Sequence, residues 1–159
     1  MFAIAGTAYV YLVYGMHDLL NVAAGVTGEP AAILVRAVEP LEGLDRMRRS
    51  VGERAAARRR SAVTSPAVRR RVADARLASG PGMVTAAFDV DRSDDGLDLL
   101  APAGRLRLEP GAPRPGERVV SGPRIGIGYA AEPWQGVPWR FWIEGHPSVS
   151  LSRGPRPGG

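Results

Sequence analysis

Three tyrosines near the start of the chain are the residues best suited to chemistry. Tyr9, Tyr11 and Tyr14 lie in the apolar run TAYVYLVYG. Because side chains alternate along a strand, Tyr9 and Tyr11 share one face, whereas Tyr14 has the other parity and precedes the break at Gly15. A ring in a pocket can stack on a base, and a ring at a hairpin tip can wedge into the gap that an extruded base leaves. The alternative is that these rings fill the core of a sheet.

A hairpin must position these rings. Residues 7–14 and 19–24 are rich in Tyr, Val and Leu, and the turn signals between them predict two paired strands. A third strand is predicted over 31–38, after a Gly-Glu-Pro turn signal, and it carries a single charge, Arg36. A lone arginine in a buried strand is hard to explain as plain surface. An ion pair with a carboxylate of another strand is the alternative.

Helical patterns follow the first strands. The spacing of apolar residues predicts a helix over 41–60, and Pro81 predicts a short helix over 79–90, capped by Ser79. Further strands are predicted at residues 106–108, 125–129 and 139–143. The order of strands, then helices, then strands favours an α+β fold with an antiparallel sheet.

We expect one compact domain over residues 1–151. Residues 58–72 are predicted to form a mobile basic loop, and residues 152–159 a disordered tail. Between residues 42 and 76 there are eleven arginines against four acids, a local charge of +7 in a chain of net charge +5. This asymmetry suggests a polyanionic partner. The alternative is a solvated helix or loop whose arginines reflect genomic base composition, because the chain contains no lysine.

The chain has no cysteine and only two histidines, His17 and His146. These counts exclude a disulfide framework and a thiolate metal site, and they are too low for a His-rich metal centre. A mixed site of histidine and carboxylate ligands stays open, although no motif in the sequence supports it. The opening apolar run has no basic region before it and is shorter than a membrane span. We expect a cytoplasmic protein without membrane association.

Five sequence blocks carry a specific resemblance. In chain order they are GTAYVYLVYGMHDLLNV, ILVRAVEPLEGLDRMR, LASGPGMVTAAF, GPRIGIGYA and PWRFWIEGHPSVS. Together they resemble the alkyladenine (3-methyladenine) DNA glycosylase family of the non-helix-hairpin-helix type. The resemblance covers the chain except the arginine-rich loop and the tail.

The resemblance implies a single compact α+β domain around a curved antiparallel sheet with a few flanking helices, and neither a metal nor a cofactor. It implies base-excision DNA repair, in which a damaged purine is flipped out of double-stranded DNA and its N-glycosidic bond is hydrolysed. A ring such as 3-methyladenine is cationic, so electron-rich aromatic faces favour it. Such a protein is expected to act as a monomer, associated with the nucleoid, on duplex DNA that contains damaged purines.

Residue by residue, the resemblance implies a base pocket and a tip that contacts DNA. Tyr11 stacks on the flipped base, Asn21 lies at the pocket floor and disfavours the exocyclic amino group of guanine, and His17 lies at the rim. Tyr14 is the intercalating wedge, and Met16 lies beside it at the DNA surface.

The same resemblance implies two residues that hold the hydrolytic water. Arg36 is the arginine that helps to bind this water and to balance the charge of the site. Ile125 occupies the position whose backbone carbonyl orients the water.

One part of the family pattern does not occur in this sequence. The general base of the family is a glutamate in a motif of the form E-x-E-A-Y, upstream of the block that matches MFAIAGTAYVY. We therefore expect that the chain lacks its N-terminal catalytic segment, either because the start is placed too late or because the gene is a fragment. A missing general base lowers the rate by about 10²–10⁴-fold.

Two other functions stay open from the sequence. The first is a non-catalytic DNA-binding remnant that keeps Tyr14 and the arginines. The second is a fold relative that binds RNA or a formyl carrier, and the block YVYLVYGMH argues against it. The sequence does not rank 3-methyladenine, 7-methylguanine, hypoxanthine and ethenoadenine as lesions.

Overall fold

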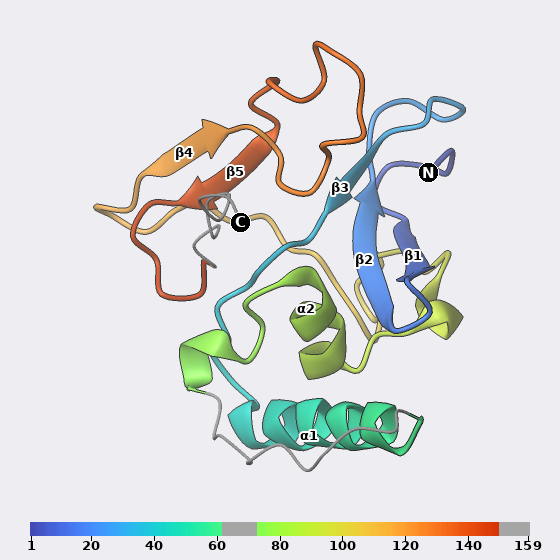
Figure 1. Cartoon of the computed structure of the whole chain (residues 1–159), viewed down its shortest axis with the longest axis vertical. Helices are drawn as coiled ribbons and strands as arrows, with labels where there is room; N and C mark the ends of the chain where they lie inside the picture. Colours follow the sequence, from blue (N-terminus) through green and yellow to red (C-terminus); the bar gives the residue numbers. More distant parts are fainter. Residues whose placement is uncertain (62–72, 150–159) are drawn as a thin grey trace, which may run out of the picture. The chain divides into compact units, whose positions relative to one another are not determined.

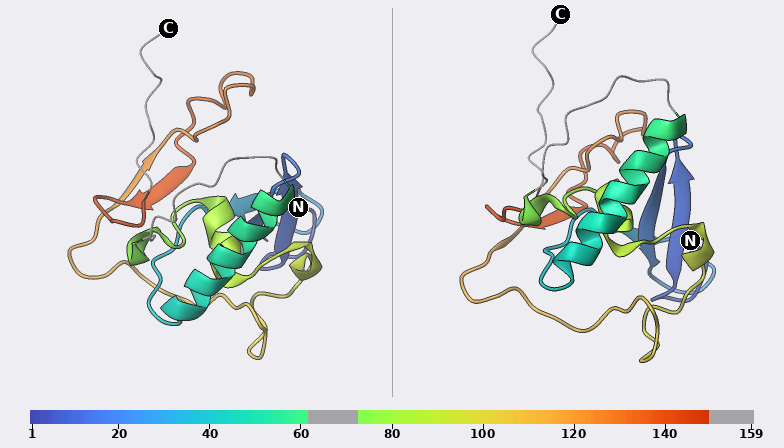
Figure 2. Two further views of the ribbon diagram at one scale, coloured as in Figure 1. Left: turned by 60° about the horizontal axis from the view of Figure 1, so that its bottom comes forward. Right: turned by 90° about the horizontal axis from the view of Figure 1, so that it is seen from below.

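The computed structural model describes residues 1–61 and 73–149. The chain divides into two units, which we call unit 1 (Met1–Glu109) and unit 2 (Pro110–Gly159). Unit 1 holds a three-stranded sheet and two α-helices, and unit 2 holds a two-stranded sheet (Figures 1 and 2). Neither described helix combines the length and the apolar composition that a bilayer span needs.

The sheet of unit 1 is antiparallel, with strand order β1-β2-β3. It consists of β1 (Ala8–Val13), β2 (His17–Ala23) and the shorter β3 (Ala32–Leu34). All six residues of β1 pair with β2, whereas β3 pairs only with the last three residues of β2. No strand among residues 1–61 and 73–149 therefore pairs with the second edge of the first residues of β2.

One face of this sheet covers the first hydrophobic cluster. Ala8 and Val10 of β1 are buried, as is Leu20 of β2, because alternate residues of a strand point to the same face. These side chains pack against Val90 and Leu99, which follow in the chain after the helices. Burying one Val or Leu side chain contributes about 1.5–3 kcal/mol, so this cluster is the main attraction between the sheet and residues 90–99.

The two helices are α1 (Leu44–Ser61) and α2 (Pro81–Phe88). Two short 3₁₀ helices flank α2, η1 (Asp74–Arg76) before it and η2 (Arg92–Asp94) after it. Proline at the first position of α2 fits the helix start, because the missing N–H of proline has no partner there in any case.

A second hydrophobic cluster joins the helices. Val84 and Ala87 of α2 are buried together with Ala78, and Met47 and Val51 of α1 pack against them. Small alanine side chains allow the helices to approach closely. As a result α2 lies between the sheet and α1 (Figure 1).

Helix α2 takes the place of a strand beside the first half of β2. The hydroxyl of Thr85, which is 1% exposed, donates to the backbone carbonyl of Asp18 at 2.8 Å. Further along, the backbone N–H of Val35 donates to the carbonyl of Leu20 at 3.0 Å. These two contacts satisfy carbonyls that a full-length third strand would otherwise pair.

Unit 2 is built on a hairpin of β4 (Val119–Gly122) and β5 (Arg140–Ile143). Between the two strands, the guanidinium of Arg124 lies 5.2 Å from the centre of the Trp139 ring. Trp134 packs beside the same ring, with centroids 5.5 Å apart. Among the described residues of unit 2, only Ser148 is buried.

The predicted α+β class with antiparallel pairing is confirmed. The strands fall in two sheets, and the third predicted strand is shorter than expected. Residues 31–38 are a strand only over Ala32–Leu34, and Ala37 forms an isolated bridge to Ser79. The division into a domain of 1–151 and a tail stays a prediction, and the tail at 152–159 lies outside the described residues.

Four local predictions are wrong. Residues 106–108 form no strand; the N–H of Leu108 donates to the carbonyl of Leu99 at 2.8 Å, but no strand ladder forms around this bond. Residues 125–129 form no strand, because Gly126 has a φ of +79° and the N–H of Ala130 donates to Ile127 in a turn. Helix α2 begins at Pro81 with Gly80 as its N-cap, so Ser79 is not the cap. Helix α1 extends through Ser61, so the first four residues of the predicted loop at 58–72 are helical. The rest of that loop, 62–72, lies outside the described residues.

Candidate functional site

The hairpin places Tyr9 and Tyr11 on one face of the sheet, together with the other residues predicted for a pocket. Tyr9 lies opposite Asn21, Tyr11 opposite Leu19, and Val13 opposite His17. Directly opposite residues of an antiparallel pair project to the same face. The rings of Tyr9 and Tyr11 stack, with centroids 5.3 Å apart and planes inclined by 28°. Both rings are half-buried.

Asn21 is the buried polar residue of this face, with 6% of its surface exposed. Its amide nitrogen donates to the backbone carbonyls of Tyr9, at 3.1 Å, and of Leu19, at 3.4 Å. These two bonds use the donor hydrogens of the amide and fix its orientation. The group that Asn21 can offer to a ligand is therefore the carbonyl oxygen, which is an acceptor.

The tip of the hairpin is a tight turn with an exposed aromatic ring. Tyr14 and Gly15 both have positive φ, +52° and +66°, and the N–H of Met16 donates to the carbonyl of Val13 at 3.1 Å. Positive φ at both central positions is the sign pattern of a type I′ turn. Tyr14 is 88% exposed and Met16 is 59% exposed. A bulky residue at positive φ is unusual, and here it directs the ring away from the sheet.

His17 lies against the start of α2. A Cβ atom on Gly82 would be only 2.9 Å from Nδ1 of His17, so the absence of a side chain at Gly82 makes room for the imidazole. Met16, His17, Asp18 and Gly82 also line an open cavity of about 400 Å³. The imidazole thus lies at the tip end of the hairpin, in the strand pair next to the turn.

The two residues expected to hold water lie in different units. Arg36 is half-buried in unit 1, two residues after Leu34, which pairs with Asn21. Ile125 belongs to unit 2 and is 38% exposed. The register of unit 1 therefore groups Tyr11, Asn21 and His17 on one face, and the position of Ile125 relative to them stays a prediction.

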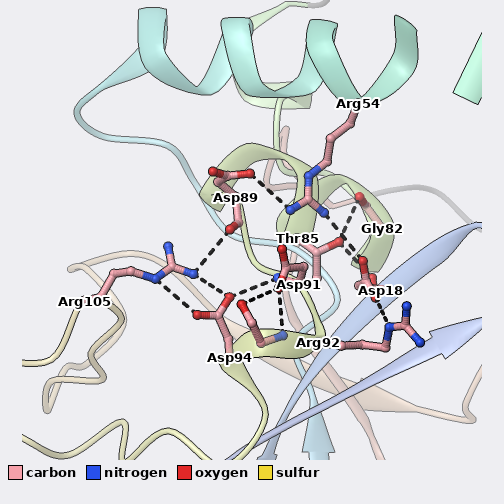
Figure 3. A network of polar contacts seen from close by, with 10 residues as sticks. Asp18, Arg54, Gly82, Thr85, Asp89, Asp91, Arg92, Asp94 and Arg105 are labelled. Carbon is pink, nitrogen blue, oxygen red and sulfur yellow. Dashed lines mark hydrogen bonds and ion pairs between the residues drawn. The ribbon is translucent and has the colours of Figure 1, made fainter. Parts of the chain in front are cut away.

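A network of arginines and aspartates around the start of β2 was not predicted from the sequence (Figure 3). Arg54 of α1 lies between two carboxylates. Its Nη1 is 3.7 Å from Oδ2 of Asp18, and its Nη2 donates to Oδ1 of Asp89 at 3.1 Å. Arg92 approaches Asp18 from the other side, with Nε 4.0 Å from Oδ1. No local motif could have identified this group, because its members come from α1, β2, η2 and the end of α2.

A second ion pair lies next to this group. Asp94, which is 4% exposed, binds Arg105 through two hydrogen bonds, one of them from Nε at 3.1 Å. The hydrogen bonds that Arg105 donates to the Asp94 carboxylate raise the pKa of the Arg105 guanidinium above its usual value. The pKa of Asp91 lies below its usual value, because its carboxylate accepts hydrogen bonds from the hydroxyl and the N–H of Ser93. The ion pair of Asp94 with Arg105 and the hydrogen bonds from Ser93 to Asp91 both stabilise the loop that follows α2.

Comparison with known proteins identifies the family of the chain. Residues 1–147 match the family described as methylpurine-DNA glycosylase (MPG). The DNA-3-methyladenine glycosylase of Mus musculus is 40% identical over 153 residues, which cover 95% of this chain and 42% of the mouse protein. The protein of the same name from Homo sapiens is 38% identical over 152 residues, which cover 95% of this chain and 47% of the human protein.

Bacterial relatives are closer in length. A Nocardia farcinica protein with the name "Putative 3-methyladenine DNA glycosylase" is 40% identical over 153 residues, or 96% of this chain. The chain spans 62–65% of the length of this relative and of those from Myxococcus xanthus and Streptomyces avermitilis. The match to the family covers nearly all of the chain, from the hairpin of unit 1 to the end of β5. The chain therefore belongs to the methylpurine-DNA glycosylase family.

Proposed function

We propose that this protein acts in base-excision DNA repair and hydrolyses the N-glycosidic bond of alkylated purines such as 3-methyladenine. The partner in this proposal is duplex DNA that contains a damaged purine, bound by a monomer. The observation that carries the proposal is the hairpin tip. Tyr14 is 88% exposed and held at positive φ, beside a face of stacked tyrosines. A core aromatic would be buried, whereas a wedge must be exposed and rigidly held.

Recognition of the base follows from the tyrosine face. The flipped purine stacks on Tyr11, and a cationic alkylated ring gains from the negative face of the aromatic ring. Asn21 offers its carbonyl oxygen, because backbone carbonyls occupy both donor hydrogens of its amide. An acceptor does not repel the exocyclic amino group of guanine, so discrimination against guanine at Asn21 would be steric. His17 bounds the pocket on the side of α2, where Gly82 makes room for it.

The chemical step exchanges one bond at the sugar. The bond between C1′ and the purine nitrogen breaks, and its electron pair leaves with the base. A water oxygen forms a new bond to C1′ and loses its proton. Alkylation makes the purine a better leaving group, because a cationic ring becomes neutral when it departs. In this proposal Arg36 holds the water, and the general base is not assigned to a residue of this chain.

The test uses the purified chain and a duplex oligonucleotide with one alkylated purine. Base release is measured by alkaline cleavage at the abasic site that it leaves. We expect Arg36→Ala to abolish release. We expect Tyr14→Ala to weaken binding to the lesion duplex. The control is Tyr129→Ala, because Tyr129 lies in unit 2 and is equally exposed, at 89%. We expect this control to leave binding unchanged. Failure of the wild-type chain both to bind the lesion duplex and to release base would overturn the proposal.

A second candidate function is lesion binding without base release. The carboxylate nearest the hairpin tip favours it, because Asp18 lies between Arg54 and Arg92 as an ion-pair partner of both. Salt-dependent binding of the lesion duplex with no release of base is the result expected for this function. Release of base that Arg36→Ala abolishes would exclude it.

A further inference from the structure

The direction of the hairpin tip depends on the residues that follow it. Tyr14 and Met16 are exposed, so the packing of the core does not fix their direction. The next two residues, His17 and Asp18, are half-buried and begin β2. Since β3 pairs only with residues 21–23, this part of β2 is not held by a strand on its second edge.

Asp18 is the residue through which the helices hold this part of the hairpin (Figure 3). Its backbone carbonyl accepts a hydrogen bond from Thr85 of α2 at 2.8 Å. Its carboxylate is 18% exposed and lies 3.7 Å from Nη1 of Arg54. Within the described part of the chain, Oδ1 of Asp18 is buried and accepts no hydrogen bond, so the two nearby guanidinium groups supply its electrostatic compensation.

Arg54 extends the connection to a third element. Its side chain is 23% exposed, and its Nη2 donates to Asp89 at 3.1 Å. Asp89 ends α2 in the left-handed conformation, with φ of +55°. One guanidinium of α1 therefore joins the start of β2 to the end of α2.

The charges make Arg54 difficult to replace. Without it, Arg92 would be the one ion-pair partner left to the half-buried carboxylate of Asp18 among the described residues, whereas Asp89 would still have Arg105 nearby. Arg92 is 69% exposed and 4.0 Å away, so water screens much of its attraction. Two carboxylates that share one cation separate when the cation is removed. The start of β2 would then lose its side-chain connection to α1.

We propose that Arg54 is a positioning residue that fixes the direction of the hairpin tip. It acts through Asp18 and Asp89, and it keeps Tyr14 and Met16 projecting as one rigid unit. The meaning of this role for DNA rests on the proposed function, but the effect on the hairpin does not. The alternative for an arginine in a basic segment is a direct phosphate contact, and the experiments below separate the two.

The first experiment needs no DNA. Hydrogen exchange is measured by mass spectrometry on wild type, Arg54→Met and Arg54→Lys. We expect Arg54→Met to raise exchange of the hydrogen-bonded amides at 16–20 by about tenfold, with little change at residues 97–99. Arg54→Lys keeps the charge and restores part of the protection. Unchanged exchange at 16–20 in Arg54→Met overturns the proposal.

The matched control is Arg46→Met on the same helix. Arg46 is exposed, and its side chain forms no ion pair or hydrogen bond in the described part of the chain. We expect normal exchange in the hairpin of this variant. Loss of protection in Arg46→Met as large as in Arg54→Met would also overturn the proposal, because the effect would then come from helix charge in general.

The second experiment compares a lesion duplex with an undamaged duplex at several salt concentrations. We expect Arg54→Met to weaken binding to the lesion duplex by about tenfold while leaving the salt dependence unchanged. A phosphate contact would instead weaken both duplexes equally and reduce the salt slope by about one. That second pattern overturns the positioning role. If wild type shows no lesion preference, the proposed function fails, and hydrogen exchange alone decides the role of Arg54.

A variant with a smaller change covers the case in which Arg54→Met does not fold. Asp89→Asn removes one of the two carboxylates, and asparagine accepts the left-handed conformation of the helix end. We expect it to raise exchange at 16–20 by about threefold, less than Arg54→Met, because Asp18 keeps its cation. Normal exchange in folded Asp89→Asn would contradict a bridge through Arg54.

Discussion

In unit 1, two clusters of buried apolar side chains hold a sheet and two helices together. In unit 2, by contrast, Ser148 is the only buried residue among those described. The side chains of unit 2 interact at its surface instead. Arg140 lies 4.4 Å from the centre of the Trp142 ring, and Nε of Arg118 donates to Glu144 at 2.8 Å. A two-stranded hairpin with contacts of this kind is marginally stable by itself.

The difference in packing between the two units affects how firmly the proposed site residues are held. The residues proposed to bind the base and to enter DNA, among them Tyr11, Tyr14 and Asn21, lie on the unit that has a core. A site on packed strands is held more accurately than one on loops. Ile125, which the family resemblance implicates in orienting the water, lies in unit 2, where the described residues include no buried apolar side chain. Base binding is therefore expected to survive perturbations that disorder unit 2.

The largest expected difference between the units comes from truncating a core side chain. Leu99 is 1% exposed in the first cluster, so Leu99→Ala should lower the free energy of unfolding by about 2–5 kcal/mol. Phe141 in unit 2 is 68% exposed, and Phe141→Ala should cost less than about 1 kcal/mol. Urea unfolding followed by circular dichroism at 222 nm measures both. Equal losses would contradict the assignment of the core to unit 1.

A smaller difference should appear in wild type between two spectroscopic probes. All three tryptophans, Trp134, Trp139 and Trp142, lie in unit 2, whereas both described α-helices lie in unit 1. In urea, tryptophan fluorescence should therefore change before the helical signal, by about 1 M, which corresponds to roughly 1–3 kcal/mol. Coincident transitions would show that the two units unfold as one cooperative body.

Ion pairs extend the same comparison. Arg105→Met leaves the carboxylate of Asp94 buried without its cation, which should cost about 2 kcal/mol, near the low end for such pairs because Arg105 is half exposed. Arg118→Met removes the partner of Glu144 from an exposed pair and should cost less than about 1 kcal/mol. Thermal melts of both variants at low and high salt measure the effects. The smaller loss, but not the larger one, should disappear at high salt.

Local patterns in the sequence predicted the hairpin of unit 1 well. Alternation placed Tyr9 and Tyr11 on one face, and the parity of Tyr14 next to Gly15 placed it at the tip; the register, the φ values and the exposure confirm both. These features depend on residues a few positions apart. The roles of Tyr11, Asn21, Arg36 and the other proposed site residues came from family resemblance, and they stay predictions.

Features that depend on distant partners could not be predicted in this way. The third strand ends at Leu34 because α2 occupies the edge of β2, through a hydrogen bond from Thr85 to a residue 67 positions away. The link from Asp18 to Arg54 likewise depends on where α1 packs. In unit 2, the apolar residues at 125–129 suggested a strand, but they form a turn that is closed by the hydrogen bond from the N–H of Ala130 to the carbonyl of Ile127.

The smallest expected effect is a pH dependence within unit 1. The carboxylate of Asp91 caps η2 by accepting from Ser93, and these bonds lower its pKa below 3.8 in the folded protein. Because the folded pKa is below the unfolded one, the stabilisation is complete above about pH 4, near the ordinary pKa of an aspartate, and is lost as pH falls through the folded pKa. Asp91 is exposed, so the contribution should be at most about 0.5 kcal/mol.

The measurement is a double-mutant cycle of Asp91→Asn and Ser93→Ala, with the free energy of unfolding determined from pH 2 to pH 7. The coupling between the two positions should be present at pH 5–7 and vanish towards pH 2, because the protonated carboxyl no longer attracts the Ser93 donors more strongly than an amide does. Coupling that does not change with pH would mean that the cap acts through geometry alone. A coupling that depends on pH would instead show that a charge-assisted hydrogen bond stabilises unit 1. This bond would then act together with the buried pairs and clusters that distinguish unit 1 from unit 2.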